Sequence, residues 1–313
     1  MKPTGFNNLS AEDAAVILEL SPILNITFAE RLVKALTDRK FYVETAQGEK
    51  RLLRICTTEH YDWLESDARA YDYMAASGIN VMRLIGMDIF HEGTLAYQLF
   101  TWFDGEDLAE VLPRMNYAEQ YSAGIKSGSV LRKLHALSPM YDDEPWGVRF
   151  RRRVQEKIQS YNDKLIKSRE VDLLLRYLQD NMELLDNRPQ TFTHGDWNAG
   201  NMMFCPDGQI GVIDFGSAQS RDPWFEFREM SCYPDSSPHF HTGHINGYFE
   251  DEPPIEFFRM FAYYMAFATF EGMCGDSIGE DVIEYIKNLL NWFDDMRNPV
   301  PTWYLDICSA TLS

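Results

Sequence analysis

Cysteine is scarce in this 313-residue chain, and its distribution excludes a disulfide framework. The five cysteines lie far apart, their number is odd, and no Cys-x-x-Cys pair occurs. This usage is typical of reduced thiols in a protein core. The chain also lacks a basic-then-apolar leader at its start, and its longest mainly apolar run, residues 260–270, is too short to span a bilayer. We therefore expect a soluble, cytoplasmic protein.

Positive charge is also in short supply. Lysine and arginine number 29 against 48 aspartates and glutamates, for a net charge of −19, and residues 101–313 carry most of this excess. An acidic surface repels nucleic-acid phosphates and anionic lipids, so we expect neither a nucleic acid nor a membrane as a partner. The charge suits a cationic ligand, although many cytoplasmic proteins are acidic for solubility alone. The sequence leaves both explanations open.

The first hundred residues have a mainly β-type pattern. Hydrophobic residues make up 45% of the whole chain, enough for a well-buried core, and no internal repeat or low-complexity linker occurs. A capping box at Ser10 and Asp13 predicts a short helix to residue 20. Extended segments are expected at 23–36, 41–45, 51–55, 80–89 and 95–101, with a helix at 63–77. The first three extended segments predict an antiparallel meander.

The pattern becomes mainly helical after Asp104-Gly105. Expected helices cover residues 118–136, two segments within 154–185, 253–273 and 280–296, and only residues 191–215 carry loop and short-strand signals. We predict an α+β fold of two lobes. A small, antiparallel β-rich lobe spans residues 1–100, a larger helical lobe spans residues 101–313, and the hinge lies at about 98–104.

One segment concentrates oxygen-bearing side chains in a way that points to phosphate chemistry. Asp196 and Asn201 lie in a loop with two glycines, and Asp214 follows the apolar pair Val212-Ile213. The glycines let backbone and side chains crowd one small volume. Mg²⁺ binds carboxylates together with phosphate oxygens, and phosphoryl transfer also needs a group that orients the attacking hydroxyl. These three residues supply both needs, unless they only cap neighbouring backbone groups.

The motif that contains these residues resembles known catalytic loops. His194-Gly195-Asp196 with Asn201, followed by Asp214-Phe215-Gly216, is similar to the catalytic loop and metal-binding DFG of protein kinases, but HGD replaces HRD and no APE follows. The form is more similar to the aminoglycoside phosphotransferase family and its choline, fructosamine and homoserine kinase relatives. The family pattern is also matched at residues 101–106, at the Leu131-x₃-His135 helix end and at Asp222-Pro223.

The resemblance implies both a fold and an activity. The fold is the two-lobed, protein-kinase-like one, and the enzyme transfers the γ-phosphoryl group of Mg-ATP or Mg-GTP to a hydroxyl of a small molecule. By the same resemblance, Asp196 is the catalytic base or hydroxyl-orienting residue, and Asn201 and Asp214 hold Mg²⁺. His194 is implied to be a buried strut that fixes the loop.

The nucleotide side departs from protein kinases. No Gly-x-Gly-x-x-Gly loop occurs, and the loop at residues 37–40, in the position of the phosphate lid, has no glycine. By the resemblance, Arg54 replaces the usual phosphate-binding lysine, or it is a plain surface arginine. Its acidic partner is Glu65 or Asp67, unless both are solvated helix charges. The hinge backbone at Gln98 and Phe100 is expected to bind the purine, which leaves ATP and GTP undistinguished.

The acceptor side is expected in the helical lobe, where residues 219–280 contain 11 acidic side chains against three arginines. A carboxylate-lined cleft would attract a polycationic acceptor such as an aminosugar antibiotic. The candidate residues are Glu226, Glu229, Asp235, Glu271 and Asp276, which could instead form an ordinary solvated acidic face. Three histidines at residues 239, 241 and 244 have conceivable metal spacing, but nothing completes a site, and we interpret them as loop histidines.

Other functions stay open at this point. The chain could be a metabolic kinase of choline, an amino sugar or an amino alcohol. Arg54 and the missing glycine loop also allow a catalytically weak nucleotide-binding pseudokinase, and a metallohydrolase built on the histidines is a more distant alternative. The expected partners are a nucleoside triphosphate and a small-molecule acceptor, and the expected oligomeric state is a monomer or weak dimer.

Overall fold

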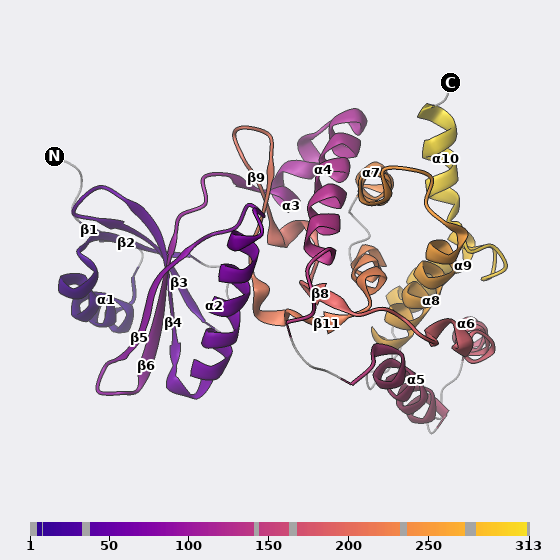
Figure 1. Cartoon of the computed structure of the whole chain (residues 1–313), viewed down its shortest axis with the longest axis horizontal. Coiled ribbons are helices and arrows are strands. Elements are labelled where there is room, and N and C mark those ends of the chain that lie inside the picture. Colours follow the sequence, from indigo (N-terminus) through magenta and orange to yellow (C-terminus); the bar gives the residue numbers. More distant parts are fainter. Residues whose placement is uncertain are drawn as a thin grey trace. The chain divides into compact units, whose positions relative to one another are not determined.

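The computed structural model describes residues 5–7, 9–32, 38–140, 144–162, 168–231, 237–272 and 280–311 (Figure 1). The chain folds as two compact units. The first contains residues 1–105, 205–207 and 211–216, and the second contains residues 106–204, 208–210 and 217–313. Each unit has buried hydrophobic residues of its own.

The first unit is built on a six-stranded sheet with the order β1-β2-β3-β4-β6-β5. Its strands are β1 (Gly5–Asn7), β2 (Ile26–Leu32), β3 (Arg39–Thr45), β4 (Lys50–Thr57), β5 (Leu84–Phe90) and β6 (Leu95–Thr101). Strands β2, β3 and β4 form the antiparallel meander that the sequence predicts. Strand β6 continues the antiparallel pairing from β4 to β5, and the short β1 pairs in parallel with β2.

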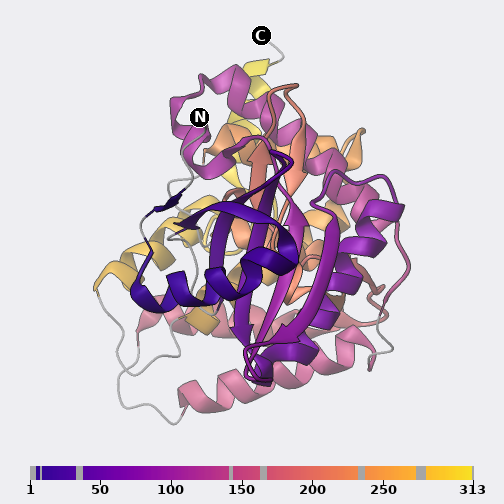
Figure 2. The same ribbon diagram turned by 90° about the vertical axis from the view of Figure 1, so that its left-hand side faces the viewer.

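Helix α1 (Ala11–Leu24) covers one face of this sheet (Figure 2). It begins as predicted, because the Ser10 side chain accepts a hydrogen bond of 3.0 Å from the backbone N–H of Asp13. It continues past the predicted end at residue 20, through Pro22, and stops at Asn25 in the left-handed conformation. The apolar side of α1 packs against alternate residues of the sheet in one buried cluster, which includes Val16, Ile17, Leu20, Phe41, Val43, Leu53 and Ile55.

Helix α2 (Tyr61–Ala76) lies on the side of the sheet that the other alternate residues face. Its Leu64 shares a buried cluster with Cys56 of β4, and its Tyr71 ring lies 4.8 Å from the ring of Phe100 on β6. The helix ends before Gly78, which has a φ of 74° and so favours glycine. This face of β4 and β6 therefore points toward α2 and carries Arg54 and Gln98.

The second unit is mainly helical. Its helices are α3 (Leu108–Val111), α4 (Tyr117–His135), α5 (Trp146–Asn162), α6 (Arg169–Asp180), α7 (Pro238–Phe249), α8 (Ile255–Gly272), α9 (Glu280–Trp292) and α10 (Thr302–Thr311). Short strands accompany them: β7 (Glu106–Asp107) pairs with β9 (Met202–Phe204), and β8 (Thr191–Thr193) pairs with β11 (Gln219–Arg221), both antiparallel. The 3₁₀ segments η4 (Ala199–Asn201) and η6 (Pro223–Ser231) complete the region around the predicted catalytic loop.

Helix α8 contains the apolar run at residues 260–270, which lies in the core of the second unit. Residues all around the helix are buried, including Phe257, Met260, Phe261, Tyr264 and Phe267. A helix that is apolar on all sides is typical of a protein core. Throughout the part of the chain described above, no helix combines the length and hydropathy needed to cross a membrane.

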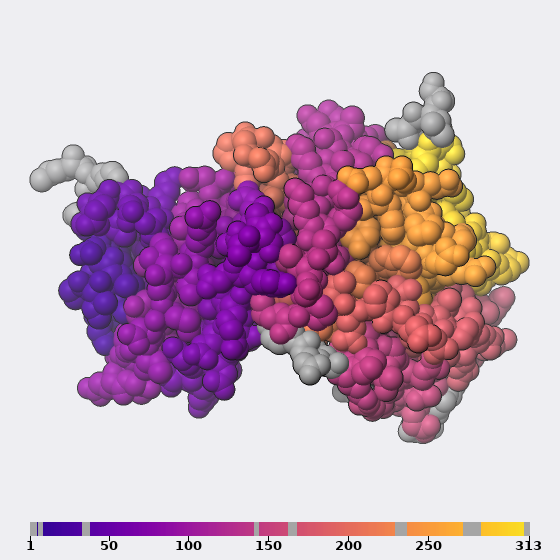
Figure 3. All heavy atoms as spheres, in the orientation of Figure 1, coloured from indigo at the N-terminus to yellow at the C-terminus, as the bar shows by residue number. Residues whose placement is uncertain are grey.

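Helices α4 and α7 approach each other closely through glycines. A Cβ atom placed on Gly128 of α4 would lie 2.0 Å from the carbonyl oxygen of His244, and one on Gly247 of α7 would lie 2.1 Å from that of Ile125. Only glycine fits at such a distance. The surfaces of α4, α7 and α10 lie next to one another (Figure 3). Asn246 of α7 forms hydrogen bonds with Tyr121 of α4 and Tyr304 of α10.

The histidines at residues 239, 241 and 244 lie on helix α7, so their interpretation as loop histidines is wrong. Ser237 caps this helix and Pro238 occupies its first turn, where the missing N–H of proline is tolerated. Burial lowers the pKa of His241 to about 4 and that of His244 to about 3. In the described segments, no group of three or more His, Cys, Asp or Glu side chains is arranged to hold a metal ion.

Candidate active site

Asp196 lies in the loop between β8 and η4, and two asparagines hold its carboxylate. Asn201 Nδ2 donates a hydrogen bond of 2.7 Å to Oδ2 of Asp196 and one of 2.9 Å to its backbone oxygen. Asn198 Nδ2 donates to Oδ1 over 2.7 Å, while Asn198 Oδ1 accepts from the backbone N–H of Gly200. Each carboxylate oxygen is thus held by an amide, which limits the rotation of the side chain.

The turn before Asp196 requires glycine. Gly195 has a φ of 89°, and a Cβ atom at this position would lie 2.0 Å from the carbonyl oxygen of Ser217. The fully buried His194 accepts a hydrogen bond of 3.2 Å at Nδ1 from the backbone N–H of Asp196. The side chain of His194 therefore lies inside the loop, where it can support the loop backbone.

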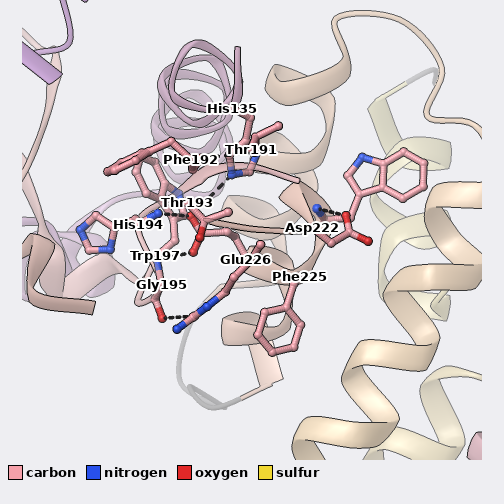
Figure 4. A network of polar contacts seen from close by, with 12 residues as sticks. His135, Thr191, Phe192, Thr193, His194, Gly195, Trp197, Asp222, Phe225 and Glu226 are labelled. Atoms are coloured by element: carbon pink, nitrogen blue, oxygen red, sulfur yellow. Dashed lines mark hydrogen bonds and ion pairs between the residues drawn. The ribbon is translucent and has the colours of Figure 1, made fainter. Parts of the chain in front are cut away.

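Glu226 of η6 holds the same loop from its buried side (Figure 4). Its Oε2 accepts a hydrogen bond of 2.8 Å from the backbone N–H of His194, and its Oε1 accepts one of 2.6 Å from that of Gly195. The Nε2 atom of His135 lies 3.5 Å from Oε2. Burial by itself would raise the pKa of Glu226, but His135, His194 and the backbone hydrogen bond lower it to about 2.

The acceptor role expected for Glu226 does not fit this position. The residue is 1% exposed, and both carboxylate oxygens are engaged by the loop backbone. A carboxylate enclosed in this way fixes the loop that carries Asp196 instead of contacting a solute. The sequence analysis missed this role because the acidic composition of the region suggested a surface.

Asp222, at the Asp-Pro step matched to the family pattern, anchors the start of η6. Its fully buried carboxylate accepts hydrogen bonds of 2.5 and 3.1 Å from Arg188, one of 2.7 Å from the Tyr264 hydroxyl and one of 2.9 Å from the backbone N–H of Trp224. Asp222 thus positions the segment from which Glu226 reaches the loop.

Asp214 belongs to the first unit, whereas Asp196 and Asn201 belong to the second. Its backbone has a φ of 67°, and its N–H donates a hydrogen bond of 2.8 Å to the Tyr71 hydroxyl of α2. Its side chain is 40% exposed and lies 3.5 Å from Nζ of Lys40. The predicted convergence of all three oxygen donors involves both units and stays a prediction.

Arg54 lies inside the first unit and is 2% exposed. Its Nε donates to Oδ2 of Asp38 over 2.6 Å, and its Nη1 donates to Oδ2 of Asp67 over 2.5 Å. Burial lowers the pKa of Arg54, but the charges of Asp67 and Asp38 outweigh it and raise the pKa. The alternative of a plain surface arginine is wrong.

The other residues predicted on the nucleotide side occupy different environments. Asp67 is buried beside Arg54, whereas Glu65 is exposed, so Asp67 is the acidic partner of the arginine. Gln98 and Phe100 are fully buried in the interior strand β6, which pairs with β4 on one side and β5 on the other. Gln98 Nε2 donates a hydrogen bond of 2.8 Å to the backbone oxygen of Leu64. The purine contact predicted for the backbone of these two residues does not fit this position, because β6 pairs with a strand on each side there.

The remaining acceptor candidates are not brought together. Glu271 pairs with Arg153 over 2.5 Å and lies 3.8 Å from Lys157, both on α5. Asp235, Asp276 and the side chain of Glu229 lie outside the described residues.

Comparison with known proteins supports the assignment suggested by these loops. The model of the phosphotransferase enzyme family matches residues 29–258. Among curated proteins, no sequence match is found. The solved structures that match include aminoglycoside 2''-phosphotransferase IIIa with GDP and kanamycin, with a TM-score of 0.66 and 15% identity over 92% of this chain and 99% of that one.

Two further solved structures have similar scores. The ADP-bound aminoglycoside phosphotransferase APH(2'')-Ib has a TM-score of 0.61 and 14% identity over 93% of this chain and 99% of that one. The amicoumacin kinase hAmiN, in complex with AMP-PNP, Ca²⁺ and Ami, has a TM-score of 0.59 and 13% identity over 94% and 97%. The family match and the shared kinase-like fold show that this chain belongs to the phosphotransferase enzyme family and is a small-molecule kinase that transfers phosphate to hydroxyl groups.

Proposed function

We propose that this kinase transfers the γ-phosphoryl group of Mg-ATP or Mg-GTP to a hydroxyl of a small cationic molecule, with Asp196 as the residue that orients the hydroxyl. The observation that carries the proposal is the Asp196 carboxylate, which Asn198 and Asn201 hold in one orientation. The loop itself is anchored by Glu226. A carboxylate that is held in this way, yet is only partly buried, is suited to meet a substrate.

The reaction is an in-line displacement at phosphorus. The hydroxyl oxygen of the acceptor forms a bond with the γ-phosphorus, the bond to the β–γ bridging oxygen breaks, and the nucleoside diphosphate leaves. Asp196 accepts the proton of the hydroxyl. Positioning of this kind typically contributes about 10²–10⁴ in rate.

The chemistry of each predicted donor suits a magnesium ion. Asn201 uses its amide nitrogen toward Asp196, so its Oδ1 is the amide atom available to a cation. Asp214 supplies a carboxylate that is 40% exposed and already has an ammonium group beside it. Bound Mg²⁺ would neutralise charge on the transferred phosphoryl group. The backbone of β6 is paired with strands on both sides up to its end at Thr101. The purine would therefore meet the backbone after the strand, at residues 102–104.

A cationic acceptor is supported by charge. The excess of carboxylates over ammonium and guanidinium groups lies mostly after residue 100, and a field of this sign raises the local concentration of cations. One of the similar structures, an aminoglycoside phosphotransferase, was solved with kanamycin bound. A cytoplasmic location is proposed on the cysteine usage, which is typical of reduced thiols.

The test is an acceptor screen that measures nucleoside diphosphate release with both ATP and GTP. The panel should contain aminoglycosides, choline, amino sugars and amino alcohols. Asp196→Asn is expected to lower turnover about 10²-fold or more. One of the amides of Asn198 and Asn201 would then face an NH₂ group, so a small drop in melting temperature is expected, and cooperative thermal unfolding shows that the variant is folded. Asp180→Asn, on an exposed aspartate at the end of α6, is the matched control. Undiminished turnover in Asp196→Asn would reject the assigned role.

A further inference from the structure

By the resemblance, Arg54 occupies the position of a phosphate-binding lysine, but its guanidinium is already held by two buried carboxylates. Asp38 binds its Nε, Asp67 binds its Nη1, and its Cζ lies 4.9 Å from the centre of the Trp63 ring. Both carboxylates have side chains that are no more than 3% exposed. Withdrawal of Arg54 would leave two buried carboxylates without their cation, which is strongly unfavourable.

Lys40 lies directly beside Arg54 on the neighbouring strand. In the antiparallel pairing of β3 with β4, residue 40 is the register partner of residue 54, so the two side chains extend from the same face of the sheet. The Nζ atom of Lys40 lies 3.5 Å from Oδ2 of Asp214 and 3.9 Å from Oδ1 of Asp38. Its side chain is 20% exposed, compared with 3% for Arg54. The lysine therefore brings a positive charge to the proposed magnesium ligand.

The charges around Lys40 allow its ammonium group to exchange one anionic partner for another. Arg54 and Lys40 supply two positive charges to Asp38, Asp67 and Asp214, and Oδ1 of the buried Asp67 has no hydrogen-bond partner. Magnesium at Asp214 would add positive charge beside Lys40 and weaken its attraction to that carboxylate. The ammonium, with three donors on a flexible stem, could then turn to phosphate oxygens.

We propose that Lys40 is the cation that binds the nucleotide phosphates, and that Arg54 holds the surrounding carboxylates in place. The proposal rests on the function proposed above. It places the phosphate-binding residue on β3, next to β4, where this role was expected for Arg54. It also removes one of the two reasons for regarding the chain as a pseudokinase, because the phosphate-binding charge is retained at residue 40 when residue 54 is arginine.

The experiment measures binding of ADP and of adenosine, or of GDP and guanosine, to the full chain in the presence of Mg²⁺ by titration calorimetry. Lys40→Met is expected to weaken diphosphate binding about 10-fold or more and to leave nucleoside binding unchanged, because only the diphosphate offers charged acceptors to the ammonium. Lys287→Met is the matched control, since Lys287 lies on α9, is 52% exposed and pairs with Glu284, far along the chain from every proposed nucleotide-binding residue. The melting temperature of each variant shows whether it is folded.

The outcomes separate the two proposals. If the wild-type protein transfers phosphate while Lys40→Met binds the diphosphate as tightly as the wild type, the role of Lys40 is refuted and the proposed function stands. If the wild-type protein binds the diphosphate but phosphorylates no acceptor, the proposed function fails, and the ratio of diphosphate to nucleoside affinity in Lys40→Met still decides the role of Lys40. A wild-type protein that binds neither diphosphate refutes both.

Discussion

Replacement of Glu226 by glutamine tests whether the buried anchor of the catalytic loop controls both stability and turnover. The carboxylate accepts two backbone hydrogen bonds, at His194 and Gly195. A glutamine amide has only one oxygen, so one of these N–H groups would face an NH₂ group and stay unpaired. A buried, unpaired donor costs about 1–3 kcal/mol, and loss of the charge-assisted bond adds to this, so we expect a loss of about 2–4 kcal/mol.

The expected effect on catalysis follows from the position of Asp196, one residue after Gly195. A displacement of about 1 Å in a catalytic group can lower the rate about 10²-fold. Urea unfolding gives the stability of Glu226→Gln, and turnover with the best acceptor gives the rate. The control is Glu250→Gln, whose side chain is 60% exposed and pairs with Arg132, so it should change stability by less than about 1 kcal/mol.

The pH dependence of stability provides a second measurement on Glu226. Its pKa is lowered from 4.5 to about 2, so the ionised carboxylate contributes stability that is fully present above about pH 4.5 and is lost as the pH falls toward 2. A shift of this size corresponds to about 3 kcal/mol. The wild-type protein and Glu226→Gln should therefore become more similar in unfolding free energy as the pH falls. A difference that stays constant with pH, or unchanged stability and turnover at neutral pH, would refute the reasoning.

Two further predictions concern the helices of the second unit. Gly128→Ala should destabilise the protein by about 1–3 kcal/mol, because a Cβ atom there would lie 2.0 Å from the carbonyl oxygen of His244, and this outweighs the better helix propensity of alanine. Gly86→Ala, at a glycine with open space, is the control in thermal unfolding, and equal melting temperatures would contradict the expectation. Burial lowers the pKa of His244 from 6.5 to about 3, so its neutral form contributes stability that is present above about pH 6.5 and is lost as the pH falls toward 3. His244→Gln should accordingly lose less stability than the wild type between about pH 7 and about pH 4.5 in urea titrations, and equal losses would contradict this assignment.

The sequence predicted the fold well where local patterns and tertiary structure agree. The capping residue Ser10, the β2-β3-β4 meander and the long helix α4 are found with boundaries close to those expected. Helix α7 was missed because its glycines and histidines have low helix propensity, and its stability comes from close packing against α4. Strand β11 was also not predicted, because it has only three residues and its pairing partner β8 lies far away in the sequence.

The candidate site was predictable in its motif and not in its charge network. The loop was recognised by the spacing of Asp196 and Asn201. This spacing allows the Asn201 amide to donate hydrogen bonds to the carboxylate and the backbone oxygen of Asp196. Asp67 was one of the two acidic partners predicted for Arg54, but Asp38 was not predicted, because it precedes β3 and meets Arg54 only in the folded sheet. The position of Lys40 beside Arg54 follows from the register of β3 and β4, which the turn at Gly48 fixes. Register partners in such a pair extend from the same face of the sheet.

The glycine contacts between α4 and α7 also set how the protein tolerates sequence change near its reaction centre. The Ser127 hydroxyl, next to Gly128, lies 3.3 Å from Nε1 of Trp197 and 3.0 Å from Nδ1 of His244. The spacing of the two helices thus decides whether Ser127 can touch the residue that follows Asp196. In a mutational library, outward positions of α4 and α7 should accept many substitutions, whereas the inward glycines should accept none, although no glycine takes part in the chemistry.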